Sequence, residues 1–165
     1  LYYACIVNLC IFRYSFLPMK PKDTFDFQIR KSWISLSKMY NELVAPYGIT
    51  VSVGFALLNI DVQKGTPSTA LGPKMGMEST SLSRILKSME KQGLIIREPN
   101  PNDRRSVIIK LTESGKEKRN HSRRAVLGFN NKVRESIGHD RAKEFFSTLE
   151  DITSVIQESR SEDLR

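Results

Sequence analysis

The chain has 165 residues, which fits one domain, and its 39% hydrophobic and 27% charged residues are ordinary for a globular protein and exclude a disordered one. The net charge of +8 is unevenly placed, because residues 62–124 carry 14 Lys and Arg against 6 Asp and Glu. Basic charge gathered on one module is typical of a polyanion binder, although it can also be a solvated surface that maintains solubility.

Residues 1–18 differ in composition from the rest of the chain. They begin without Met, and their apolar run is interrupted by polar residues and is too short for a membrane span of ~20 residues. They also lack the basic start and the cleavage site of a secretory signal. We interpret this segment as non-native or upstream sequence, with Met19 as the true start. Both cysteines, Cys5 and Cys10, fall within it, so the remaining chain has no thiol for a disulfide, a zinc site or a redox sensor.

Two helices are expected next. Apolar and aromatic side chains recur at three- and four-residue steps over residues 24–47, which predicts a long helix that ends at Pro46-Tyr47-Gly48. A second helix is expected to begin with Thr50 as its cap, to run through Val62 and to close at Gly65. This helix is apolar on most sides, so it should lie in the core.

A helix-turn-helix is predicted over residues 66–92. Thr66-Pro67 has the pattern of a cap followed by proline at the first helical position, and this pair should open the first helix. Gly72-Pro73 falls inside that helix, where a proline costs ~3 kcal/mol or more, so a short or bent segment is expected. The second helix has an apolar stripe at i, i+3, i+4 and i+7, formed by Leu82, Ile85, Leu86 and Met89.

The free face of this second helix is unlike an ordinary solvated surface. An ordinary solvated face has Glu and Lys in balance. This face has hydroxyl side chains, which extend to Ser88, and cationic side chains. Reading base edges and gripping phosphates requires such groups. We therefore predict a DNA-recognition helix whose contact residues are Ser79, Thr80, Ser81, Ser83, Arg84 and Lys87.

A β-hairpin is predicted directly after the recognition helix. Gly93 should stop the helix, and the β-rich run 94–96 begins at once. Turn formers over residues 99–103 then precede an alternating run that ends at Leu111. The order of helix, glycine, strand, charged turn and strand is that of a winged helix-turn-helix. The basic tip adds Asp103, Arg104 and Arg105 to the predicted DNA contacts.

Two further helices are expected after the hairpin. Thr112 should cap the first, whose start is basic and whose later part has an apolar stripe. The basic start can be a solvated face or can contact phosphate. After Gly138, a last helix has the seam of a helix that packs against helices. That seam consists of Ala142, Phe145, Leu149, Ile152 and Ile156.

The hairpin and its surroundings carry a family resemblance. Asp103-Arg104-Arg105, five further residues and then Leu111-Thr112 match the signature D-x-R-x5-L-T, and Glu113-Ser114-Gly115 follows as the usual opening of the next helix. From about residue 20 to residue 158, the chain resembles the MarR-type (multiple antibiotic resistance regulator) transcription factors. We therefore expect a mostly α fold with a small β-wing, in which a winged helix-turn-helix is joined to long N- and C-terminal dimerisation helices.

This reading divides the chain into parts. A single MarR-like domain is expected over residues 19–165, with the winged-helix DNA-binding lobe over 49–112. The dimerisation helices are expected over 20–47 and 113–160. The resemblance implies that these helices interlock in a homodimer. It also implies that the carboxylate at the wing tip holds the guanidinium two residues later in a pose suited to the minor groove.

The resemblance further implies double-stranded DNA as partner and, often, a small aromatic acid as effector, bound where the dimer helices meet the winged domain. Trp33, Tyr40 and Tyr47 can line such a pocket, or they can be core packing. No cofactor, metal or membrane partner is expected, and we expect a cytoplasmic protein. Because His121 and His139 have no Cys, Asp or Glu at metal or triad spacing, we expect no enzyme.

Three functions stay open at this point. The favoured one is a dimeric DNA-binding regulator, most often a repressor, whose affinity for an operator changes with a small ligand. A winged-helix protein-interaction module would be favoured if the wing-tip signature were absent, and it is present. A binder of double-stranded RNA, or of DNA without operator specificity, would differ from the first in competition with random DNA.

Overall fold

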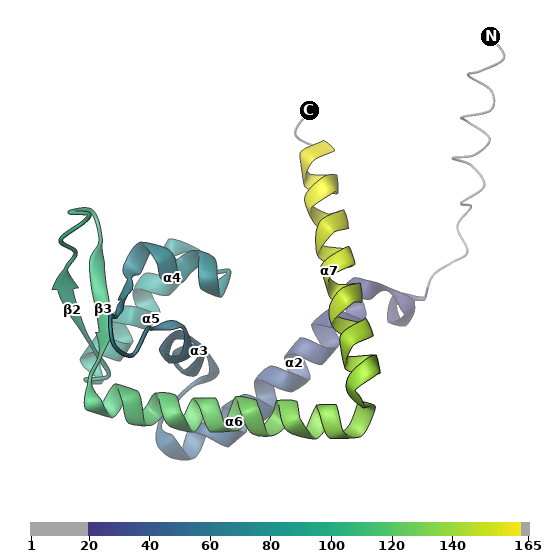
Figure 1. The fold of residues 1–165 in the computed structure, drawn as a ribbon, viewed down its shortest axis with the longest axis horizontal. Coiled ribbons are helices and arrows are strands. Elements are labelled where there is room, and N and C mark those ends of the chain that lie inside the picture. The colour runs from purple at the N-terminus through teal and green to yellow at the C-terminus, as the bar shows by residue number, and fades with distance from the viewer. Residues whose placement is uncertain (1–19, 163–165) are drawn as a thin grey trace, which may run out of the picture. The chain divides into compact units, whose positions relative to one another are not determined.

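The computed structural model of the protein describes residues 20–162 (Figure 1). The segment 1–18, interpreted above as non-native, lies outside the described residues. The chain divides into two compact units, one up to Met39 and one from Tyr40 onward. The described part of the first unit holds η1 (Pro21–Asp23) and most of α2 (Phe25–Val44).

The second unit holds the end of α2 and all later described elements. In chain order these are η2 (Ala45–Tyr47), α3 (Val51–Asn59), β1 (Thr66–Pro67), α4 (Ser68–Met75), α5 (Ser79–Lys91), β2 (Ile95–Pro99), β3 (Val107–Leu111), α6 (Glu113–Ile137) and α7 (His139–Glu162). The strands form an antiparallel sheet in the order β1-β3-β2. Helices α3 to α5 with this sheet make a winged helix-turn-helix, so the predicted mostly α fold with a small β-wing is confirmed.

The core of the second unit gathers residues from α3, α4, α5 and the sheet. Its largest fully buried side chains are Leu57, Ile60, Leu71, Met89, Leu94, Ile95 and Ile109. Burial of one such side chain stabilises the fold by ~1.5–3 kcal/mol relative to exposure. The predicted stripe of α5 is confirmed, because Leu82 and Leu86 are also buried and Ile85 is half-buried.

Helix α3 has the predicted cap and a different end. The Thr50 hydroxyl oxygen accepts the backbone N–H of Val53 at 3.3 Å. The helix stops at Asn59, so the prediction that it continues through Val62 is wrong.

A turn organised by Asp61 ends this helix. The carboxylate of Asp61 accepts the backbone N–H groups of Lys64 at 2.7 Å and Gln63 at 2.9 Å. The N–H of Asp61 itself donates to the Thr66 hydroxyl oxygen at 2.9 Å. Such local side-chain bonds compete with helical ones. The N–H of Lys64, and then that of Gln63, also lower the pKa of the Asp61 carboxyl.

The predicted helix start at Thr66-Pro67 is wrong. These residues form β1 and pair with β3, while the Thr66 hydroxyl is engaged by the preceding turn. Helix α4 begins at Ser68, whose hydroxyl oxygen accepts the N–H of Val107 at 3.4 Å. The helix is only eight residues long with Pro73 inside it, which confirms the expected short segment.

The long helices have the expected ends. α2 closes in the single turn η2, and Gly48 adopts the left-handed conformation with φ 65°. The Thr112 hydroxyl oxygen caps α6, and Gly138 separates α6 from α7. No single helix in the described range is long and apolar enough to cross a membrane. The bent pair α2–η2 and α3 passes that test together, by length and composition, as core helices also do.

Gly65 provides a test of the finding that Thr66-Pro67 forms a strand beside β3. Its φ is +72°, and an added Cβ would lie 2.7 Å from the carbonyl oxygen of Ile109. We expect Gly65→Ala to lower the free energy of unfolding by more than ~1 kcal/mol in urea denaturation. The matched control is Gly128→Ala in α6, where a Cβ meets open space, and it should raise stability by ~0.5–1 kcal/mol. Equal shifts of both variants would contradict the close approach at β1.

Candidate nucleic-acid interface

Helix α5 has two faces of opposite character. Its apolar stripe is buried in the core, and the predicted contact residues all lie exposed on the rest of its surface: Ser79, Thr80, Ser81, Ser83, Arg84 and Lys87. Neither Arg84 nor Lys87 takes part in an ion pair among the described residues. Both cations are therefore available to an anionic partner.

The N-terminus of α5 adds to this character. Glu78 precedes the helix in an extended conformation and gives no side-chain cap bond. The first turn contains Ser79, Thr80 and Ser81, and no acidic residue. Free backbone N–H groups at a helix start carry partial positive charge, which favours a phosphate there.

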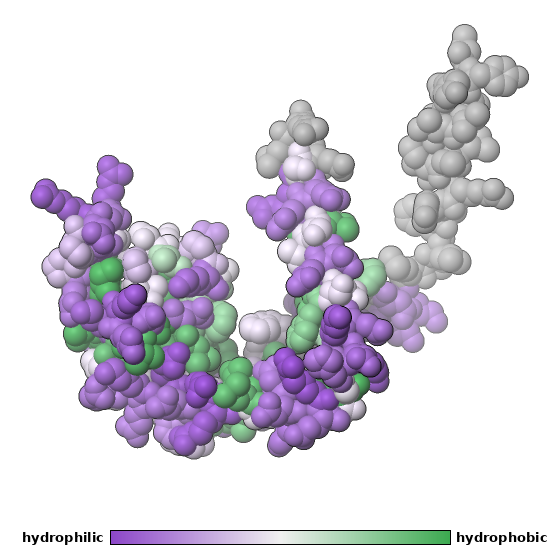
Figure 2. Space-filling view, viewed as in Figure 1, coloured by the Kyte–Doolittle hydropathy of each residue, from purple (hydrophilic) through white to green (hydrophobic). Residues whose placement is uncertain are grey.

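The loop between β2 and β3 is held by its own polar side chains. The Asn100 amide nitrogen donates to the Ser106 hydroxyl at 2.7 Å, which ties the two ends of the loop. Arg104 and Arg105 are exposed and form no ion pair among the described residues. In Figure 2 the tip of this hairpin is hydrophilic. The loop therefore presents two free guanidinium groups on a closed turn.

Asp103 bonds to the backbone of this loop. One carboxylate oxygen accepts the N–H of Arg105 at 2.9 Å, and the Asp103 carbonyl accepts the N–H of Ser106 at 3.1 Å. The ion pair between Asp103 and the Arg105 guanidinium, which the family resemblance implied, is not among the ion pairs of the described residues. In this structure the carboxylate shapes the turn.

Two ion pairs orient the hairpin. Arg97 of β2 contacts Glu90 of α5 at 3.0 Å, and Lys110 of β3 contacts Glu98 of β2 at 2.6 Å. These side chains are partly exposed, so each pair stabilises the fold by only ~0–1 kcal/mol. Arg97 and Lys110 on the strands are thus engaged in ion pairs. Arg104 and Arg105 at the tip of the hairpin form none among the described residues.

Sequence analysis did not identify a hollow of about 450 Å³ beside the hairpin, lined by Arg97, Glu98, Pro99, Asn100, Arg104, Ser106 and Val107. The lining comes from both strands and from the loop. No local sequence pattern indicates it, because the register of β2 on β3 brings these residues together. Only the turn-forming composition of residues 99–103 pointed to this region.

The three aromatic residues of the predicted effector pocket have separate surroundings. The ring of Tyr40 meets Phe129 edge-on, with centroids 5.8 Å apart, and burial raises the pKa of Tyr40. The ring of Tyr47 stacks on His121 at 3.6 Å. Trp33 belongs to the first unit and is 58% exposed. The pocket stays a prediction.

Comparison with known proteins places this geometry in a family. A profile of the MarR family matches residues 49–107. The organic hydroperoxide resistance transcriptional regulator of Bacillus subtilis (strain 168) is 34% identical over 97 residues, which cover 59% of this chain and 66% of that protein. The winged-helix part of the chain thus matches the MarR family.

A further relative supports this match. The multiple antibiotic resistance protein MarR of Escherichia coli (strain K12) is 31% identical over 78 residues, which cover 47% of this chain and 54% of that protein. The chain thus spans less than two thirds of the length of these curated MarR-family relatives. Both are named as resistance proteins or regulators, and neither as an enzyme.

Solved structures share the fold. The transcriptional repressor CouR bound to a 23-mer DNA duplex superposes with a TM-score of 0.70 at 24% identity, covering 84% of this chain and 99% of that one. The MepR–DNA complex of S. aureus gives a TM-score of 0.74 at 17% identity, covering 80% and 98%. At such identities the likeness establishes the winged helix-turn-helix fold.

Proposed function

We propose that this chain is a MarR-family DNA-binding transcription regulator that acts as a homodimer on an imperfect palindrome. The observation that carries the proposal is the exposed face of α5. There Arg84 and Lys87 form no ion pair with any residue from 20 to 162, and they lie among short hydroxyl side chains. The opposite face is committed to the core, so the polar face is the one that a ligand can reach.

The geometry suits a duplex. An α-helix fits the major groove, where Arg can bond the O6 and N7 atoms of guanine and short hydroxyl groups can accept or donate. The loop with Arg104 and Arg105 would then reach the flanking backbone or minor groove, as a wing does. The basic excess of residues 62–124 supplies the charge that neutralises phosphates.

Exposed apolar side chains support the homodimer. On α2 they are Phe25, Phe27, Ile29, Trp33, Ile34 and Leu43, and on α7 they are Phe145, Phe146, Val155 and Ile156. Large apolar side chains left exposed along a helix are suited to an interaction site. We assign it to a second copy of the chain, with residues 20–47 and 113–160 as dimerisation helices and 49–112 as the DNA-binding lobe. The two recognition helices would meet half-sites ~10 bp apart or a small multiple of that.

We also propose a repressor that works in the cytoplasm and responds to a small aromatic or other organic effector. Support comes from similar solved structures. CouR is called a transcriptional repressor, and CouR from Rhodococcus jostii RHA1 is described as bound to p-coumaroyl-CoA. Trp33, Tyr40 and Tyr47 remain our candidates for the effector pocket.

The proposal is tested by mapping protected sites across host DNA and measuring the mass of the complex by light scattering. We expect a dimer that protects a few palindromic sites. Random DNA and double-stranded RNA should fail to displace this dimer from its sites. Uniform protection along the DNA would favour a nonspecific binder. Absence of any DNA binding would favour a protein-interaction module.

Arg84 and Lys87 should differ in the kind of binding that they lose. A guanidinium can grip guanine at two atoms, whereas an ammonium acts as a point charge. We expect Arg84→Ala to cost ~1–3 kcal/mol at one operator position and to relax the base preference there. Lys87→Ala should weaken binding to all sequences alike and lower the salt slope by about one unit. Fluorescence anisotropy on operator and random DNA measures both, and equal losses on both DNAs from Arg84→Ala would reject its role in base reading.

Substitutions of Asp103 test whether its carboxylate shapes the turn or orients the Arg105 guanidinium through an ion pair. In Asp103→Asn the amide oxygen can still accept the N–H of Arg105, and a charge that repels phosphate is gone. We therefore expect Asp103→Asn to bind operator DNA as well as the wild type or better. Asp103→Ala should bind less well because the loop loses its internal acceptor. If Asp103→Asn instead loses affinity together with the preference for A·T-rich flanks, the carboxylate orients the Arg105 guanidinium as the resemblance implied.

A further inference from the structure

The recognition helix α5 ends in a fixed geometry. Gly93 adopts φ 66°, its N–H donates to the Glu90 carbonyl at 2.9 Å, and the N–H of Leu94 donates to the Met89 carbonyl at 2.9 Å. These two bonds are those of a Schellman motif with Gly at the left-handed position, and Met89 and Leu94 occupy the places of its usual apolar pair in the same core cluster. Both apolar side chains are fully buried. The carbonyl groups of Gly93 and Leu94 therefore have defined positions at the end of α5.

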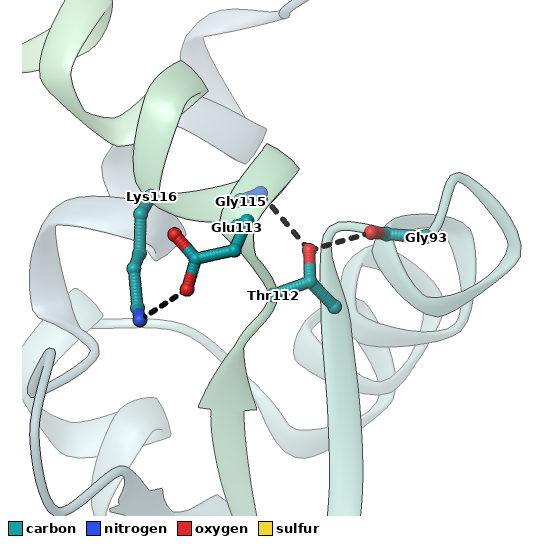
Figure 3. Close-up of polar contacts among 5 residues, drawn as sticks. All are labelled: Gly93, Thr112, Glu113, Gly115 and Lys116. Atoms are coloured by element: carbon teal, nitrogen blue, oxygen red, sulfur yellow. Dashed lines mark hydrogen bonds and ion pairs between the residues drawn. The ribbon is translucent and has the colours of Figure 1, made fainter.

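Thr112 bonds to both of these carbonyl groups. Its hydroxyl donates to the Gly93 carbonyl at 2.7 Å, and its backbone N–H donates to the Leu94 carbonyl at 3.1 Å. The same hydroxyl oxygen accepts the N–H of Gly115 at 3.0 Å, in the first turn of α6 (Figure 3). One hydroxyl thus joins the end of the recognition helix to the start of α6.

Gly115 brings the two elements into close contact. A Cβ at this position would lie 2.0 Å from the Leu94 carbonyl oxygen, so no side chain fits unless the backbone moves. Gly115 itself is buried. The first turn of α6 therefore lies directly against the residue that follows α5, and the junction has little freedom to bend.

A capping role alone does not account for these contacts. A cap needs only an acceptor for an N–H of the first turn, which the Gly115 bond provides. The donation to Gly93 serves the other side of the junction, because that carbonyl belongs to the turn that closes α5. The hydroxyl acts as donor on one side and acceptor on the other, which Thr and Ser can do and Asp cannot.

We propose that Thr112 is a positioning residue that fixes the direction of α6 relative to α5, and that it thereby determines which half-site spacing the dimer accepts. This inference rests on the proposed function, in which α6 belongs to the dimer interface. Helix α6 has 25 residues and is ~37 Å long at ~1.5 Å per residue. A change of ~5° at its start would displace its far end by ~3 Å, close to the ~3.4 Å rise of one base pair. A loose junction would therefore blur the spacing of the two recognition helices.

The test compares affinities for two operators, one with the natural half-site spacing and one with a single base pair inserted at its centre. Thr112→Val keeps the shape and loses both hydroxyl bonds. Thr112→Asp keeps a strong cap acceptor but cannot donate to the Gly93 carbonyl, which its carboxylate would repel, so it separates positioning from capping. Thr112→Ser keeps both bonds. The matched control is Thr50→Val, which removes the cap of α3 and leaves the junction intact.

We expect the wild type, Thr112→Ser and Thr50→Val to discriminate strongly between the two operators. Thr112→Val and Thr112→Asp should reduce this discrimination at least about threefold while light scattering still shows a dimer. If Thr112→Val fails to fold, Thr112→Asp decides, since its α6 remains capped. Discrimination unchanged in Thr112→Asp would overturn the proposal.

The outcome also distinguishes this inference from the proposed function. If the wild type binds a palindrome as a dimer and every variant keeps the same spacing preference, only the role of Thr112 is refuted. If the wild type binds no palindrome, or binds one with no spacing preference, the proposed dimeric readout and the role of Thr112 are both refuted.

Discussion

Burial of one face of α5 is the constraint on which the rest of this structure depends. Leu82, Leu86 and Met89 fix the rotation of the helix about its axis, because turning it by one residue would expose this stripe to water. That rotation also determines which side chains remain outside. Arg84 and Lys87 are exposed because the stripe is buried, so stability of the fold and presentation of the polar face have the same cause.

The elements that could be predicted are those whose causes are local. The stripe of α5, the glycine after it and the cap at Thr112 depend on residues within a few positions of one another, and each was found where expected. The alternating run before Leu111 likewise placed β3 correctly. In these segments periodicity and capping chemistry are sufficient, because the partners are close in sequence.

The elements that could not be predicted depend on distant partners. Thr66-Pro67 has the local pattern of a helix start, yet it pairs with β3 some forty residues later, and two residues are too few for any periodicity. The end of α3 was misplaced because apolar residues continue past Asn59, while the turn around Asp61 takes the backbone elsewhere. At the wing tip, Asp103 bonds the nearest backbone N–H, which only the loop conformation reveals.

Protection of guanine N7 atoms from methylation, on a DNA fragment selected from the host genome, tests the central claim most directly. Guanine N7 lies in the major groove, which the exposed face of α5 is proposed to enter. The account predicts two separate blocks of protected guanines, with centres ~10 bp apart or a small multiple of that. In Arg84→Ala, the guanine that Arg84 contacts in each block should lose its protection. Tight binding that protects the backbone of the fragment but no guanine N7 would contradict it.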